Sequence, residues 1–136
     1  MDMKDQRFGI EIEMTGVTRE QAAKVAAAYF GTSSRYIGSG YDAYAALDGQ
    51  GRQWKFMSDA SLNPQRKEGR RKVPASDEYR TEMVSPICRY EDIETVQEII
   101  RKLKEAGAIT NNSCGIHVHI EASPFNANTL RNITNI

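Results

Sequence analysis

Cysteine, histidine and net charge are scarce in this 136-residue sequence, and each scarcity argues against a class of protein. The two cysteines, Cys88 and Cys114, have no close spacing, so we expect neither a disulfide framework nor a zinc knuckle, and a reducing cytoplasm fits. The formal net charge is zero, so no general attraction to nucleic acid or to an anionic membrane is expected. No run of about 18 apolar residues occurs, so no membrane span is predicted. The polar N-terminus does not resemble a signal peptide.

The composition is instead that of a globular domain. Apolar residues make up 40% of the chain and charged residues 26%, which is typical of soluble globular proteins. A chain of 136 residues suffices for one hydrophobic core and is short for two. We therefore expect residues 1–136 to form a single domain.

The stretch from Phe8 to Met14 alternates apolar and polar residues with the period of a β-strand. Its apolar members suit a core, whereas Glu11 and Glu13 share the other face, about 7 Å apart at roughly 3.3 Å per residue. Two carboxylates at this distance repel each other unless a cation lies beside them. The stretch alone leaves two interpretations open: a platform for a divalent metal, and an ordinary half-exposed strand whose charged face meets water.

Periodicity and turn residues predict the other elements. Thr18 and Gln21 form a capping box before an apolar pattern of helical spacing that ends at Gly31. A second apolar stripe has acidic residues in its first turn and lysines in its last. Helices are expected at about 19–30 and 91–106 and from 128 onward, strands at 41–47, 52–58, 78–85 and 114–121, and a hairpin turn at 48–51.

Residues 63–77 have little to bury, and no secondary structure is predicted for them. Five of the seven residues from Arg66 to Lys72 are basic. One interpretation is a solvated, mobile insertion; another is a flexible flap that meets an anionic substrate or a nucleotide phosphate.

The only two histidines, His117 and His119, lie two residues apart and therefore share a face of the strand predicted at 114–121. Glu82 lies in the strand predicted at 78–85, and Asp59 follows the strand predicted at 52–58. If these strands join one sheet, their side chains and the Glu11–Glu13 pair surround one or two cations. Carboxylate-rich ligands with one imidazole suit magnesium or manganese rather than a closed zinc site.

Each of these residues also has a local alternative. Glu82 can pair with Arg80, and Asp59 can form a turn with Ser61. The histidines can be satisfied by local hydrogen bonds. The combination of the three motifs, rather than any one residue, is what favours a metal site.

Four short motifs then occur in a distinctive order. They are Phe-Gly-Ile-Glu-Ile-Glu at 8–13, the Trp-x-x-x-x-Asp-x-Ser-Leu stretch at 54–62, Glu-Met-Val-Ser-Pro at 82–86 and Cys-Gly-Ile-His-Val-His at 114–119. In this order the sequence resembles the amidoligase family of the carboxylate–amine ligase superfamily, which includes glutamine synthetase and glutamate–cysteine ligase. The resemblance covers nearly the whole chain outside the basic insertion. It implies an α+β fold, with a curved, mostly antiparallel sheet and helices packed on one face.

The resemblance also implies an activity and its cofactors. ATP and two or more divalent cations, Mg²⁺ or Mn²⁺, would lie on the concave face of the sheet. A small-molecule or peptide carboxylate would form an acyl phosphate, which an amine would convert to an amide. By analogy, the metal ligands and catalytic residues would be Glu11 at one metal, Glu13 and Glu82 with Asp59 at another, and His117, while His119, Arg80 and Ser61 would bind the nucleotide.

In the family, the domain continues past the His-x-His strand with an arginine-rich strand and a further metal carboxylate. We therefore expect residues 1–136 to be the N-terminal part of a longer domain, to bind divalent metal weakly and to have little or no ligase activity. We also expect self-association through an exposed sheet edge.

Two further hypotheses are a non-catalytic metal-binding module of the same fold and a phosphotransferase acting on an amine or guanidino group. A cupin-type protein fits less well, because its carboxylate ligand follows the His-x-His pair, whereas Glu11 and Glu13 precede it by about a hundred residues.

Overall fold

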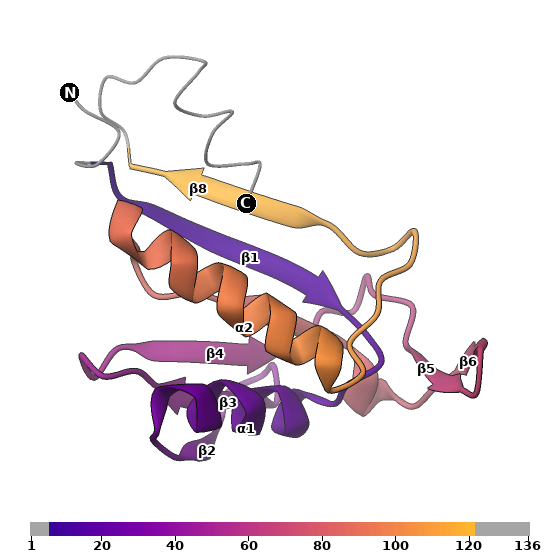
Figure 1. Cartoon of the computed structure of the whole chain (residues 1–136). Coiled ribbons are helices and arrows are strands. Elements are labelled where there is room, and N and C mark those ends of the chain that lie inside the picture. The colour runs from indigo at the N-terminus through magenta and orange to yellow at the C-terminus, as the bar shows by residue number, and fades with distance from the viewer. Residues whose placement is uncertain (1–5, 122–136) are drawn as a thin grey trace.

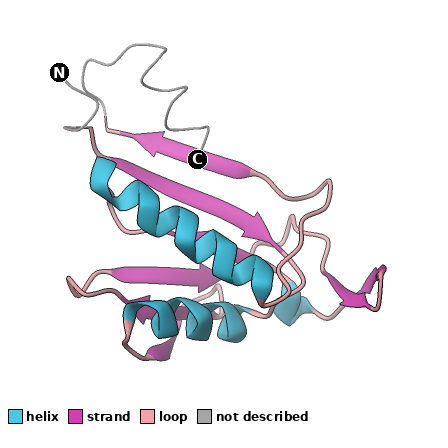
Figure 2. Cartoon of the chain, in the orientation of Figure 1, coloured by secondary structure: helices cyan, strands magenta, loops and turns pink. Residues whose placement is uncertain are grey.

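The computed structural model describes residues 6–121, and a six-stranded sheet with two helices on one face dominates it (Figures 1 and 2). The sheet contains β1 (Phe8–Met14), β2 (Ser34–Gly38), β3 (Ala43–Leu47), β4 (Gln53–Met57), β7 (Thr81–Val84) and β8 (Ile116–Ile120). Its order is β2-β3-β4-β7-β1-β8, and every neighbouring pair is antiparallel. The remaining elements are α1 (Arg19–Phe30), α2 (Ile93–Glu105), the hairpin β5 (Gln65–Glu68) with β6 (Arg71–Pro74), and two 3₁₀ turns, η2 (Asp77–Tyr79) and η3 (Tyr90–Asp92). This architecture confirms the predicted α+β fold class.

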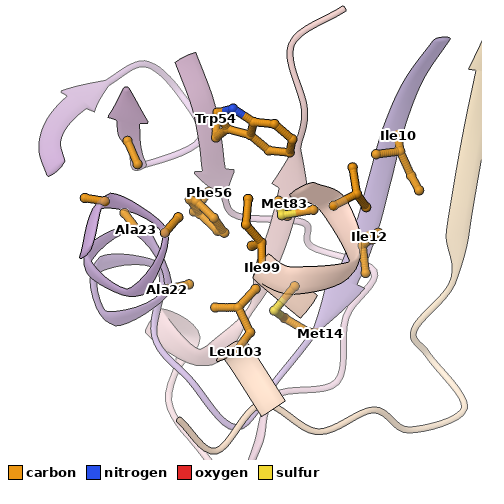
Figure 3. Close-up of a cluster of buried hydrophobic side chains, with 14 of the residues drawn as sticks. Ile10, Ile12, Met14, Ala22, Ala23, Trp54, Phe56, Met83, Ile99 and Leu103 are labelled. Atoms are coloured by element: carbon orange, nitrogen blue, oxygen red, sulfur yellow. The ribbon is translucent and has the colours of Figure 1, made fainter. Parts of the chain in front are cut away.

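The core lies between the sheet and the two helices. The apolar side chains of β1 are buried, as its alternation predicts, and Trp54 and Phe56 of β4 are fully buried. Figure 3 shows Phe56, Met83 and Met14 gathered around Ile99 and Leu103 of α2. Burial of each such side chain stabilises the fold by roughly 1.5–3 kcal/mol relative to leaving it exposed. Because the apolar residues face the helices, the polar residues of the same strands must face the other way.

Helix α1 has the predicted bounds and caps. Thr18 Oγ1 accepts a hydrogen bond from the Gln21 N–H, and the Gln21 side chain accepts one from the Thr18 N–H. Gly31 ends the helix at φ 72°, a conformation that glycine adopts without steric cost. Four buried alanines let the helix lie close to the sheet: Ala22, Ala23, Ala26 and Ala27.

Several predicted bounds were too wide. β3 begins at Ala43 rather than 41, because Asp42 has a φ of 49° and cannot continue a strand. The strand predicted at 78–85 is limited to 81–84, since η2 occupies its first residues. Helix α2 starts at Ile93 rather than 91, because η3 comes first. The strand predicted at 114–121 covers only 116–120.

Two segments with no predicted structure contain strands. β2 lies within residues 32–40, and the β5–β6 hairpin lies within residues 63–77. The hairpin is attached to the body at its base, where Gln65 exchanges hydrogen bonds with Thr15 and its carbonyl oxygen also accepts one from the Gly16 N–H. The mobility of this basic segment stays a prediction.

Two further expectations concern the ends and surface of this part of the chain. The helix predicted from residue 128 lies outside the described residues. β2 and β8 are the outermost strands of the described sheet, and self-association through an edge stays a prediction. None of the helices within residues 6–121 has the length and apolarity needed to cross a membrane.

The cross-strand register arranges the polar face of the sheet in rows. Glu11 on β1 lies opposite His117 on β8 and Val84 on β7. One row along, Glu13 lies opposite Glu82, which in turn lies opposite Met57 on β4. Residues directly opposite each other project to the same side of the sheet. The acidic residues of β1 and β7 and the histidines of β8 therefore share the face that the two helices do not cover.

Candidate metal centre

Three carboxyl groups from distant parts of the sequence converge on this open face. Glu13 comes from β1, Glu82 from the neighbouring strand β7, and Asp59 from the turn after β4. One oxygen from each residue lies within 4.8 Å of the others. The structure thus brings together the three residues that the family resemblance groups at one metal.

Glu13 lies at the bottom of this cluster, with only 6% of its surface exposed. Gly115, just before β8, donates its backbone N–H to the Glu13 carboxylate and accepts the Glu13 N–H at 3.0 Å. A Cβ atom on Gly115 would lie 3.3 Å from Glu13 Oε1 and 3.9 Å from His117 Nε2. The missing side chain therefore makes room for the Glu13 carboxylate, one of the predicted ligands. This role was not predicted, although the sequence places a glycine two residues before His117.

Asp59 is held in place by its own turn. Its Oδ1 accepts hydrogen bonds from the Ser61 N–H at 2.9 Å and the Ser61 hydroxyl at 2.7 Å, as in an Asx-type turn. The local alternative for Asp59 and Ser61 is thus correct, yet the same carboxylate also interacts with Glu13 and Glu82 in the cluster. Nucleotide binding by Ser61 stays a prediction.

Arg80 supports the same turn from the other side. Its Nε donates to the Leu62 carbonyl oxygen at 2.9 Å, and its Nη1 donates to Asp77 Oδ1 at 2.7 Å. The alternative pairing of Glu82 with Arg80 is therefore wrong, because Asp77 is the ion-pair partner of Arg80. Nucleotide binding by Arg80 stays a prediction, and its observed contacts are structural.

Arg19, at the start of α1, is buried, although nothing in the sequence indicates this. Its guanidinium group donates to the carbonyl oxygens of Asp42, Asp77 and Arg80, and it forms an ion pair of 2.7 Å with Asp42. It therefore ties the β2–β3 loop to the segment that leads into β7. No periodicity distinguishes this arginine from a solvated one at the start of a helix.

The electrostatics of the cluster are those of carboxyl groups forced together. Burial, followed by repulsion from Glu11, Asp59 and Glu13, raises the pKa of Glu82 to about 7. Burial also raises the pKa of Glu13, and its contact with Asp59 adds to this effect. Hydrogen bonding from Glu13 and Ser61 lowers the pKa of Asp59 to about 2. Without a cation, the Glu82 carboxyl group is therefore partly protonated near neutral pH.

Glu11 and the two histidines form a second group beside the cluster. Glu11 Oε1 lies 2.8 Å from Nε2 of His119, which is two residues along β8 from His117, the direct cross-strand partner of Glu11. The side chain of Glu11 is 31% exposed and that of His119 is 65% exposed, so both can be reached by a ligand. The structure therefore places Glu11 near the histidines and leaves Glu13 with Asp59 and Glu82.

A cavity of about 640 Å³ opens onto both groups. Glu11, Asp59, Glu82 and His117 line it. Tyr41, from the loop between β2 and β3, forms part of its rim and is 60% exposed. The volume lies within the range of small-molecule sites and exceeds what a metal ion alone would fill.

The donor set fits a hard divalent cation. The cluster offers carboxylate oxygens from three residues, and an imidazole lies next to it, a combination typical of magnesium or manganese sites. Such a cation would also offset the repulsion that raises the pKa of Glu82.

Comparison with known proteins gives one match, to a family model. Residues 4–136 match the family model described as "Putative amidoligase enzyme". No curated protein and no solved structure gives a significant match.

Proposed function

Because this chain belongs to the amidoligase family, we propose that it carries the metal- and ATP-binding face of a ligase that joins a carboxylate to an amine. The observation that supports this most directly is the convergence of Glu13, Asp59 and Glu82 within 4.8 Å on an open sheet face. The adjoining cavity has room for a nucleotide phosphate chain and a substrate carboxylate.

We assign the roles of the residues from their positions. Glu13, Asp59 and Glu82 would hold one divalent cation, and Glu11 with His117 would hold another. His119, exposed beside Glu11, would contact the phosphate oxygens. When bound, Mg²⁺ or Mn²⁺ neutralises the phosphate oxygens and aligns the reacting atoms.

The proposed ligation proceeds in two steps. A carboxylate oxygen of the acid attacks the γ-phosphorus of ATP, and ADP leaves, which gives an acyl phosphate. The amine nitrogen then attacks the acyl carbon, phosphate leaves and the nitrogen loses a proton, which gives the amide. Side chains on the open face contribute by positioning and by electrostatic stabilisation rather than by forming covalent intermediates.

Metal binding can be tested directly on the 136-residue chain by titration calorimetry with Mn²⁺ and Mg²⁺ at pH 8. Replacing Glu13 or Glu82 with Gln should weaken binding at least about tenfold, because a carboxylate ligand is lost while the side-chain shape is kept. Glu20→Gln, on the exposed side of α1, is the matched control and should bind like the wild type. Equal affinities for all four proteins would overturn the assignment.

The reaction class can be tested by mass spectrometry of mixtures containing ATP, a panel of acidic amino acids and a panel of amines. An amide with stoichiometric ADP and phosphate supports the ligase. A phosphorylated amine or guanidino product would favour a phosphotransferase, and failure to bind either Mg²⁺ or ATP would favour a non-catalytic module.

A further inference from the structure

The open face carries a second charged feature, on the strands away from the carboxylate cluster. Arg35 on β2 lies directly opposite Ala45 on β3, and Ala45 lies directly opposite Lys55 on β4. All three project to the face that the helices leave open, because their neighbours Tyr44 and Phe56 pack on the core. We propose that Arg35 and Lys55 form a seat for an oxyanion, either a phosphate group or a carboxylate.

The charges of these two residues are available to a ligand. Within residues 6–121, neither the Arg35 guanidinium nor the Lys55 ammonium has an ion-pair or hydrogen-bond partner. This distinguishes them from Arg19, Arg52 and Arg80, each of which is paired with an aspartate. A strand face with two unpaired cations and no acidic residue between them attracts anions.

Ala45 shapes the space between the two cations. Strands lie about 4.8 Å apart, so residues on β2 and β4 that face the same β3 residue are separated by roughly 10 Å between Cα atoms. Two long cationic side chains can close over a small ligand across that gap, because the intervening alanine projects only a methyl group. Ala45 is 1% exposed although both helices lie on the other face, which indicates that neighbouring side chains extend over it. The half-buried position of Lys55 limits its freedom and favours this arrangement.

The seat lies in line with the metal centre. Lys55 is directly opposite Val84 on β7, and Val84 is directly opposite Glu11 on β1. Lys55 is therefore two strand spacings, roughly 10 Å, from Glu11. An elongated substrate can place its anionic end on the seat and its reacting end beside the carboxylates. The placement of an elongated substrate across both sites depends on the proposed ligase function, whereas anion binding by Arg35 and Lys55 does not.

Two anions share the required chemistry: the phosphate chain of the nucleotide and a carboxylate at the far end of the acid substrate. Guanidinium binds either group through two parallel hydrogen bonds, and lysine adds a point charge. Pyrophosphate and glutarate serve as probes that distinguish these two sources.

The test is a titration of the ¹⁵N-labelled 136-residue chain, followed by amide NMR in metal-free, low-salt buffer. Pyrophosphate or glutarate should shift the amide signals of Arg35, Ala45 and Lys55 in a saturable way. Lys55→Gln and Arg35→Gln should each weaken this binding about tenfold, as expected for the loss of one charge-assisted contact. Lys55→Arg should retain it. Lys24→Gln, on α1 and paired with Glu20, is the matched control and should bind like the wild type.

Stronger binding of pyrophosphate would assign the seat to the nucleotide, and stronger binding of glutarate would assign it to the acid substrate. The proposal of an anion seat is contradicted if neither probe shifts the amide signals of these residues. It is also contradicted if Lys55→Gln and Arg35→Gln bind the probes as tightly as the wild type. The result is independent of the metal centre, because Glu82→Gln should weaken Mn²⁺ binding and still bind the probe without metal. Failure of the seat and failure of the proposed metal site are thereby distinguished.

Discussion

At the level of single residues, we expect the protonation state of Glu82 to control metal binding at the candidate centre. Its carboxyl group has a pKa of about 7, chiefly because it is buried and then because three other carboxylates surround it. A cation can bind only the deprotonated form, so metal binding must displace this proton. We expect the apparent affinity for Mn²⁺ to rise steeply between pH 6 and pH 8. Calorimetry in buffers of different ionisation enthalpy should detect proton release at pH 6.5, and a pH-independent affinity would contradict this.

The same group sets a pH dependence of stability in the metal-free protein. Its pKa is raised above the ordinary value of 4.5, so the stability it contributes is fully present below pH 4.5 and is lost as pH rises through 7. The melting temperature of the metal-free protein should therefore fall between pH 5 and pH 8. Glu82→Gln should flatten this decline in thermal denaturation followed by circular dichroism. An unchanged slope in the variant would show that other groups cause it.

Gly115 provides a second prediction at this scale. A methyl group there would lie 3.3 Å from Glu13 Oε1, so the Glu13 carboxylate must shift by a few tenths of an ångström. We expect Gly115→Ala to lower metal affinity about tenfold, as for other residues that orient ligands, with little change in melting temperature. Gly49→Ala is the matched control, because a Cβ there meets nothing within 4 Å. Equal metal affinities in both variants would refute a positioning role.

At the level of elements, alternation in the sequence was enough to predict β1 and the bounds of α1. Phe8 and Met14 are both buried, and Thr18 and Gly31 cap the helix as expected. Such elements have one buried face and one exposed face, and this contrast is what periodicity records. β2 was missed because no apolar alternation marks it: Arg35 and Tyr36 are adjacent and both exposed.

The hairpin β5–β6 escaped prediction for a related reason. Its strands run from Gln65 to Glu68 and from Arg71 to Pro74, and they bury almost nothing. Backbone pairing between them and the bonds of Gln65 to Thr15 maintain the structure instead. Backbone hydrogen bonds leave no pattern of side-chain types in the sequence.

The turn between β3 and β4 was predicted, but its buried acid was not. Asp48 has a side chain only 4% exposed, and it accepts hydrogen bonds from the Gln50 and Arg52 N–H groups, from Arg52 Nε and from Trp54 Nε1. Arg52 also pairs with Asp92 at 2.9 Å, which joins this turn to the start of α2. One aspartate therefore connects a hairpin, a core tryptophan and a helix.

We expect Asp48→Ala to lower the free energy of unfolding by about 2–4 kcal/mol, because it leaves the buried Trp54 N–H and part of Arg52 without acceptors. Urea denaturation of both proteins gives this difference. Glu91→Ala, at an exposed acid nearby, should stay within about 0.5 kcal/mol of the wild type. A loss as small as that of the control would mean that water replaces the aspartate.

For the whole molecule, the candidate centre depends on how strands far apart in the sequence are ordered in the sheet. The sequence could nominate Glu13, Asp59 and Glu82, because each lies in or just after a recognisable strand. It could not place β7 between β4 and β1, and this order is what brings the three carboxyl groups within 4.8 Å. The family resemblance grouped these three residues at one metal, but only the structure gives the strand order that brings them together.

Since the centre joins β1, β7 and the turn after β4, a bound cation should stabilise the entire fold. Free Mg²⁺ at one hundred times its dissociation constant would add about 2.7 kcal/mol to the free energy of unfolding. At roughly 3–5 °C per kcal/mol for a domain of this size, the melting temperature at pH 8 should rise by roughly 8–14 °C. Glu13→Gln should lose this rise, whereas Glu20→Gln should keep it. NaCl of equal ionic strength should reproduce little of the effect, because screening acts on all charges and leaves the repulsion at this buried cluster largely in place. An equal rise in Glu13→Gln and the wild type would show that Mg²⁺ stabilises the protein from elsewhere on its surface.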